Sequence, residues 1–174
     1  QPAYGTPKGI NTSGISDANS TLSCTLTTNT VGNTVALIVR IKNYDNNPVS
    51  NISVSLSSDR LFVDTITQPA ATNALGYCTG YLYSTKSGTS IISVKSPNNL
   101  TDTISIYWTS GAVSKTKSYF TYNSPVSIND TSVIYITYMD SFSNPVQNET
   151  AIIVATAGTI IQPQTNSDSN GHTT

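Results

Sequence analysis

The chain has 174 residues, which is enough for one or two domains. Charged residues make up only 10% of it and the formal net charge is −1, so the composition excludes the basic surface with which proteins attract nucleic acid or anionic membranes. It also does not fit a disordered chain, because disorder pairs low hydrophobicity with high net charge.

Residues 1–20 are rich in Pro, Gly, Ser and Asn and show no apolar period. This composition predicts an extended tail or linker. The first residue is Gln1 rather than Met, as in a secreted protein after processing or in a trimmed chain. No stretch reaches the 18 apolar residues of a membrane-spanning helix.

Alternating apolar strands begin after this tail. The polar turn NYDNNP at 43–48 separates the predicted strand 34–42 from another at 52–56. An irregular stretch follows at 57–71. Every second side chain of the first of these strands is apolar and faces the same side: Val35, Leu37, Val39 and Ile41.

Further strands follow at a spacing of about ten residues. They are YCTGYLYS at 77–84, which follows the Gly76 turn, SIISV at 90–94 and TISIYW at 103–108. No 3.6-residue period persists for more than two turns, so no helix is predicted. Short strands at this spacing, separated by polar turns, predict an all-β sandwich.

The chain contains the same pattern twice. TVALIVRIKNYDNNPVSN at 34–51 corresponds to TSVIYITYMDSFSNPVQN at 131–148. Pro48 and Pro145 occupy the same place in the two copies, so the pattern repeats after 97 residues (145 − 48). A period this long indicates tandem domains rather than a solenoid.

The second copy stops before the counterpart of the 77–84 strand. We therefore expect a complete sandwich at 21–111 and, at 112–174, a partial second one that lacks its last strands. A sheet without its closing strands leaves an apolar face uncovered. A continuation of the chain past Thr174 could cover that face, or a neighbouring subunit could insert its N-terminal tail as a donor strand. The remaining alternative is a half-sheet or a poorly folded copy.

Two stretches carry a resemblance to a known family: VRIKNYDNNPVSNISVSLSS at 39–58 and TNALGYCTGYLYSTKSGTSIISV at 72–94. The chain resembles the group 1 bacterial Ig-like domains of the invasin and intimin type. In that family a strand, an Asx/Gly turn, Asn-Pro-Val and another strand precede a Thr-Asx-x-x-Gly turn. The similarity covers most of 20–110 and, more weakly, 113–174. It implies tandem Ig-like β-sandwiches on a cell surface, and it is evidence for fold before function.

The two cysteines, Cys24 and Cys78, fall in the first strand region and in the strand after Gly76. In an exported β-sandwich such a pair is more often a disulfide than a metal or redox site. We therefore predict a Cys24–Cys78 disulfide, which would stabilise the domain by about 4 kcal/mol in the chain-entropy model. The alternative is two free buried thiols.

Six Asn-x-Ser/Thr sequences are candidate N-glycosylation sites. In a chain this rich in Asn, Ser and Thr, several would arise by chance, so their positions matter more than their number. Asn51 and Asn148 follow equivalent turns of the two copies. We expect glycans at several of these sites if the producing host N-glycosylates secreted proteins. The six are Asn11, Asn19, Asn51, Asn99, Asn129 and Asn148.

No residue pattern indicates catalysis, a metal or a cofactor. His172 is the only histidine, and no nucleophile–base pair, carboxylate pair or phosphate-binding loop accompanies it. The acidic turns at 45–47 and 168–171 lack the six or more oxygens that calcium needs, so we interpret them as turns. Of the ten tyrosines, three share one face of the 77–84 strand, which is more often core or sheet surface than a sugar-binding platform.

These features predict a non-enzymatic extracellular structural module. Its tandem Ig-like repeats would build or extend a cell-surface layer, fibre or filament, or a virion surface, with donor-strand exchange as one route. Its partners would be other copies of itself, neighbouring surface-protein domains and glycans, without nucleic acid and without membrane insertion in this segment. The alternative is an adhesin or carbohydrate-binding module that uses exposed loops such as 57–71.

Overall fold

A computed structural model describes residues 14–97 and 100–174. The described part contains eleven strands and no helix, so the predicted all-β class is confirmed. The chain divides into two compact units. Unit 1 is Gln1–Asn29, Thr34–Tyr83 and Thr89–Tyr107, and unit 2 is Thr30–Asn33, Ser84–Gly88 and Trp108–Thr174.

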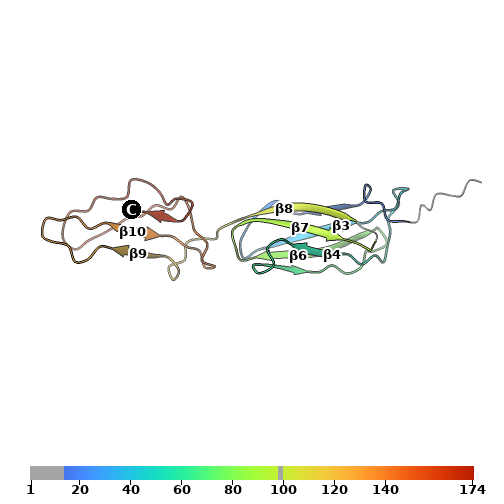
Figure 1. The fold of residues 1–174 in the computed structure, drawn as a ribbon, viewed down its shortest axis with the longest axis horizontal. Coiled ribbons are helices and arrows are strands. Elements are labelled where there is room, and N and C mark those ends of the chain that lie inside the picture. The colour runs from blue at the N-terminus through green and yellow to red at the C-terminus, as the bar shows by residue number, and fades with distance from the viewer. Residues whose placement is uncertain (1–13, 98–99) are drawn as a thin grey trace, which may run out of the picture. The chain divides into compact units, whose positions relative to one another are not determined.

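Two four-stranded sheets account for the first eight strands (Figure 1). Their strand orders are β1-β3-β6-β5 and β2-β8-β7-β4. The first sheet is made of β1 (Thr21–Cys24), β3 (Thr34–Arg40), β6 (Tyr77–Ser84) and β5 (Asp64–Thr67). The second is made of β2 (Thr28–Thr30), β8 (Thr101–Thr109), β7 (Gly88–Lys95) and β4 (Ser55–Ser58).

The core follows the predicted alternation. The inward side chains of β3, which include Val35, Leu37 and Val39, are fully buried, as is Ile41 directly after the strand. Leu56 of β4 is buried as well. Because the period along a strand is two, the side chains between these positions lie on the outer face. Strands β6, β7 and β8 contribute further buried side chains: Leu82, Ile92, Val94, Ile106 and Trp108.

Unit 2 contains one three-stranded sheet in its described residues, ordered β11-β10-β9. Its strands are β9 (Tyr119–Tyr122), β10 (Ile134–Thr137) and β11 (His172–Thr173), and β9 and β10 lie side by side in Figure 1. The register repeats that of β1, β3 and β6. Ile136 pairs with Phe120 and with Thr173, as Val39 pairs with Leu22 and with Cys78.

The turns between these strands repeat at the level of single hydrogen bonds. In each copy, the carbonyl at the end of the central strand accepts a hydrogen bond from the backbone N–H of the residue after Pro. The N–H of that same strand-end residue donates to the carbonyl of the turn glycine. The corresponding backbone bonds are Val49 N to Ile41 O and Val146 N to Tyr138 O, both 3.0 Å, and Ile41 N to Gly76 O and Tyr138 N to Gly171 O, both 2.8 Å.

In each copy, a side-chain hydroxyl makes the same pair of hydrogen bonds to the backbone after the Asn-Pro-Val turn. Thr72 Oγ1 donates to Val49 O at 2.8 Å and accepts from Ile52 N at 3.0 Å. Ser167 Oγ makes the equivalent pair of bonds, to Val146 O and from Glu149 N. Because Thr72 and Ser167 are buried, their hydroxyls satisfy backbone groups that have lost contact with water.

Residues 14–20 of the predicted tail form hydrogen bonds with Lys42, just after β3 of the first copy. Ser16 N donates to Lys42 O at 2.8 Å, and Ser20 Oγ accepts from Lys42 N at 3.0 Å. Ser114 and Ser118 make the same contacts with Met139 in the second copy. Each copy therefore begins with a short segment that lies before its first strand.

Candidate interaction surface

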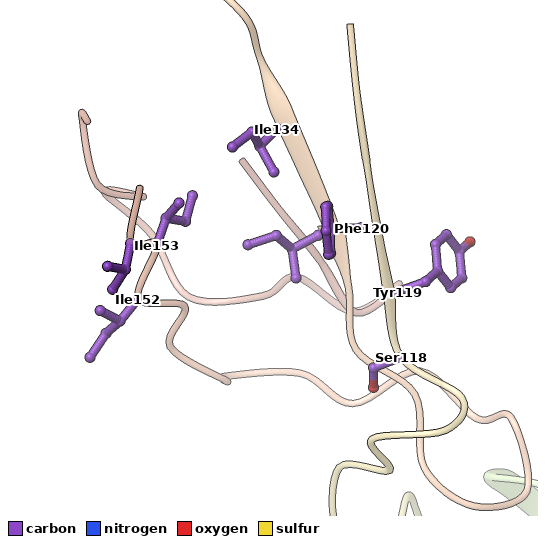
Figure 2. A pocket seen from close by; sticks show the side chains of 8 residues that line it. Ser118, Tyr119, Phe120, Ile134, Ile152 and Ile153 are labelled. Carbon is purple, nitrogen blue, oxygen red and sulfur yellow. The ribbon is translucent and has the colours of Figure 1, made fainter. Parts of the chain in front are cut away.

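The sheet of unit 2 has an open apolar face. Phe120 is 64% exposed, whereas Leu22, its counterpart in β1, is 6% exposed. A groove of about 410 Å³ runs along this face. Figure 2 shows Phe120 and Tyr119 on opposite sides of β9, with Phe120 toward the groove. The lining residues are Ser118, Tyr119, Phe120, Ile134, Ile136, Ile152, Ile153 and Val154.

The far side of the groove is the counterpart of β4. Gln68 bridges β4 through two bonds to the backbone of Leu56, each 2.8 Å. Gln162 makes the same two bonds to Ile153, at 2.9 and 2.7 Å. Ile153 therefore occupies the place of Leu56. Its neighbours Ile152 and Val154, which are 82% and 87% exposed, replace Ser55 and Ser57.

A second exposed apolar feature lies in the 57–71 stretch. Leu61 and Phe62 stand at the tip of the turn between β4 and β5, and Phe62 is fully exposed at 101%. Two side-chain contacts hold the base of the turn. Asp64 accepts from Arg60 Nη2 at 2.9 Å and from Ser58 Oγ at 2.6 Å.

The tyrosines of β6 lie on the outer face of their sheet. Tyr81 is exposed, while Tyr77 and Tyr83 are half-buried. The guanidinium of Arg40 lies 4.8 Å from the centre of the Tyr77 ring, a cation–π contact. This arrangement is a sheet surface, as interpreted from the sequence.

The predicted disulfide is wrong: Cys24 and Cys78 are both free. Strand β3 lies between β1 and β6, so the two residues are two strand spacings apart, roughly 10 Å. That separation exceeds the Cα distance of about 7 Å that a disulfide tolerates. Burial raises the pKa of both thiols, which favours the protonated form over the reactive thiolate.

Four of the six sequons lie in described residues, while Asn11 and Asn99 lie outside them. Asn51, Asn129 and Asn148 are exposed and have positive φ. Asn19 differs, because its Nδ2 donates to Asn43 O at 2.9 Å and to Tyr44 O at 3.3 Å. A glycan on that nitrogen would displace one of these bonds.

The acidic turn at 168–171 uses a carboxylate oxygen to cap the backbone. Asp168 Oδ1 accepts from Asn170 N at 2.8 Å and from His172 N at 2.9 Å. The bond from His172 N is the main cause of the lowered pKa of Asp168. Asn73 makes the same two bonds in the first copy. Within 14–97 and 100–174, no three His, Cys, Asp or Glu side chains gather as a metal site requires.

Asp140 is a buried carboxylate whose two oxygens both accept hydrogen bonds. Its Oδ1 accepts from Phe142 N and Asn144 N, both at 2.8 Å, and its Oδ2 accepts from Gly111 N at 2.9 Å. Burial by itself would raise the pKa of Asp140. The bonds from the side chain and backbone of Asn144, from Gly111 N and from Phe142 N outweigh that effect and lower it. The equivalent residue of the first copy is Asn43, which accepts the same pair of turn bonds.

The sequence predicted an uncovered apolar face on the second copy and exposed loops such as 57–71, but it did not identify the side chains that form these two surfaces. The exposure of Phe120 depends on strands elsewhere in the sandwich. Leu61 and Phe62 stand in a stretch without alternation, so their exposure had no periodic signal.

Solved structures share this fold. FdeC, an Escherichia coli adhesin, is 16% identical and superposes with a TM-score of 0.64 over 92% of this chain and 55% of that one. Invasin, a bacterial integrin-binding protein, is 16% identical with a TM-score of 0.62 over 78% and 29%. InvD of Yersinia pseudotuberculosis is 24% identical with a TM-score of 0.58 over 91% and 49%.

These likenesses establish an Ig-like sandwich as the fold of this chain. The chain spans between 29% and 55% of the length of these three structures. No family model matches the sequence, and no curated protein matches it. None of the described segments forms a helix with the length and apolarity of a transmembrane span.

Proposed function

We propose that the chain is a non-enzymatic structural module of an extracellular surface. Its tandem Ig-like units would build or extend a layer, fibre or filament. The observation that carries this proposal is the repeated hydrogen-bonded frame, in which Thr72 and Ser167, and Gly76 and Gly171, make equivalent bonds. Repetition of one rigid frame suits a spacer, because each unit adds length without new chemistry.

The fold of bacterial surface proteins supports the same location. Invasin is described as an integrin-binding protein and FdeC as an adhesin. A low charge and a hydroxyl-rich surface suit an extracellular setting in which solubility does not depend on ions. Where the host attaches N-glycans, we place them at Asn51, Asn129 and Asn148, whose side chains are exposed.

Surface labelling tests the location. An antibody raised against unit 1 should label intact cells that produce the protein, with little added signal after permeabilisation. A cytoplasmic protein should serve as the control that becomes labelled only after permeabilisation. Labelling of this chain only after permeabilisation would overturn the proposal.

Donor-strand exchange could use only a short N-terminal segment of the chain. Ser16 and Ser20 are bound to the first copy's own frame, so a neighbour could receive only residues 1–13 without breaking those bonds. Apart from proline, that stretch contains three hydrophobic residues at irregular spacing, Ala3, Tyr4 and Ile10. It therefore lacks the alternation that a core-facing strand needs.

An adhesin is the second candidate, and the Leu61–Phe62 turn favours it. Exposed aromatic and aliphatic side chains on a turn held by side-chain contacts are typical anchors for a pocket on a partner protein. If the chain binds a host-surface extract or a glycan array, Phe62→Ser should weaken that binding at least tenfold. Leu75→Ser, at another exposed apolar position, is the matched control. Equal binding by both variants would remove this turn as the anchor.

A further inference from the structure

We propose that the turn between β4 and β5 of one molecule docks into the groove of unit 2 of a second molecule of this chain. Leu61 and Phe62 at the tip of the turn are the inserted side chains, and Phe120 lies on the receiving side. The inference rests on the proposed structural function and deepens it, because it names the contact through which copies join into a layer or fibre.

The β4–β5 turn is longer than its counterpart in the second copy. Leu56 and the glutamine that clamps it, Gln68, are 12 residues apart, whereas Ile153 and Gln162 are 9 residues apart. The shorter turn has small residues, Thr, Ala, Gly and Thr, at 156–159. The shared frame therefore closes without a large apolar tip, which leaves the tip of the longer turn available for contact with a partner.

Backbone hydrogen bonds order the β4–β5 turn before it meets a partner. Val63 N and Asp64 N both donate to Arg60 O, at 3.1 and 3.0 Å. Asp59 N donates to Ile91 O at 3.1 Å, and Asp59 Oδ1 accepts from Ile91 N at 2.8 Å, which ties the turn to β7. Because the turn is already ordered, docking of its tip loses little conformational entropy.

The groove has the volume and the character to receive this tip. A cavity of about 150 Å³ holds a benzene-sized ring, so a groove of about 410 Å³ accommodates the Phe62 ring and leaves room for Leu61. Figure 2 shows Ile152 and Ile153 across the groove from Phe120. None of the lining side chains is charged, so an apolar tip can enter without burying an unpaired charge.

Charges beside the two surfaces have opposite signs. Asp59 is exposed at the base of the turn, and Lys115 and Lys117 are exposed just before Ser118, which lines the groove. In the described part of the chain the only ion pair is the one inside the turn, so none of these three charges has an ion-pair partner there. Complementary charges favour the encounter of the two surfaces and turn the Asp59 side of the tip toward the start of β9.

The occupant is a second copy because one chain carries both halves of the contact. A projection on one part of a molecule and a matching groove on another form a heterologous interface, in which each added copy presents a further projection and groove. Such an interface produces filaments or rings rather than a two-fold dimer. A contact made by two inserted side chains is smaller than a standard interface, so crowding of copies at a surface strengthens it.

Self-association of the 174-residue chain tests the contact. Its weight-average mass in sedimentation should at least double between about 10 µM and about 1 mM protein, as expected for a weak contact. Phe62→Ser removes the projection and Phe120→Ser alters the groove, and each should reduce this rise at least fivefold. Both side chains are exposed, so the amide spectra should show an unchanged fold. Leu75→Ser, at another exposed apolar position, is the matched control and should associate as the original chain does.

A mixture of the two variants tests whether the turn and the groove meet each other. Phe62→Ser keeps an intact groove, and Phe120→Ser keeps an intact projection. Equal amounts of the two should therefore form one-to-one pairs that grow no further, because each pair has only one working contact. A mixture that stays monomeric while the original chain associates would overturn the proposal.

Two other results would also overturn it. One is an original chain that stays monomeric at about 1 mM. The other is association that survives Phe62→Ser, because the groove would then meet something other than the turn. Surface labelling reads a different property: labelled cells with a monomeric chain would remove only this contact, whereas labelling only after permeabilisation would overturn the proposed surface function whatever the association.

Discussion

At the scale of single residues, the frame depends on buried hydroxyl and Asx groups. Thr72→Val keeps the side-chain shape but removes the bonds to Val49 O and from Ile52 N. We expect it to lower the free energy of unfolding of unit 1 by about 1–3 kcal/mol, the cost of leaving buried backbone groups unpaired.

The matched control for this change is Thr72→Ser, because Ser167 performs the same role in the second copy. Urea unfolding followed through Trp108, the only tryptophan, measures both variants, because this side chain is fully buried in β8 of the two-sheet core that contains β3. Equal midpoints for Thr72→Val and Thr72→Ser would show that the hydroxyl is not what stabilises this turn.

Asp140 makes the second copy sensitive to acid. Its folded pKa is lowered, so its contribution to stability is complete above the unfolded value of about 3.9. The contribution is lost as the pH falls through the lower folded pKa. As the pH falls below that unfolded value, we expect the amide signals of Phe142 and Asn144 to weaken or shift.

Asp140→Asn should remove this response, since Asn43 holds the equivalent turn as an uncharged residue. The measurement is a pH titration by amide NMR, with the turn around Asn43 as the internal reference. If the Phe142 amide of the Asp140→Asn variant keeps the acid response, another group must cause it.

At the scale of elements, the order of strands determines which residues meet. Cys24 lies in β1 and Cys78 in β6, and β3 lies between these two strands. Added reductant should therefore leave the unfolding midpoint of unit 1 unchanged, and a thiol assay in denaturant should count two free thiols per chain. A midpoint that falls with reductant would require a disulfide and a different strand order.

The same reasoning explains which parts of the fold were predictable. Alternation along 34–42 predicted the inward face of β3 correctly, because that pattern is local. The cysteine pairing depended on which strand lies between two others, and local pattern does not carry that information.

Glu149 has the backbone position of Ile52 without a register shift, and both side chains are half-buried. A charge is tolerated there because the position lies at the margin of the core.

The exposed turn at Leu61 and Phe62 shows the same limit. The irregular sequence of 57–71 was visible, but the ion pair of Arg60 with Asp64 that fixes the turn spans only four residues and has no periodic signature. Short-range pairs of this kind are common on surfaces. Only the buried carboxylate of Asp64 distinguishes this one.

At the scale of the whole molecule, the two units share one frame and differ in closure. The inward residues of β3 are covered by a second sheet, whereas Phe120 and its neighbours on β10 line an open groove. A sheet with one uncovered face gains less from apolar burial, by about 25 cal/mol for each Å² left in water. Unit 2 should therefore open more readily than unit 1.

Hydrogen exchange of the 174-residue chain tests the claim that a shared frame is closed in one unit and open in the other. The amides of Leu37 and Val39 in β3 should exchange at least a thousandfold more slowly than those of Ile134 and Ile136 at the same positions of β10. Comparable slow exchange in both strands would contradict the account, because it would mean that unit 2 is already closed.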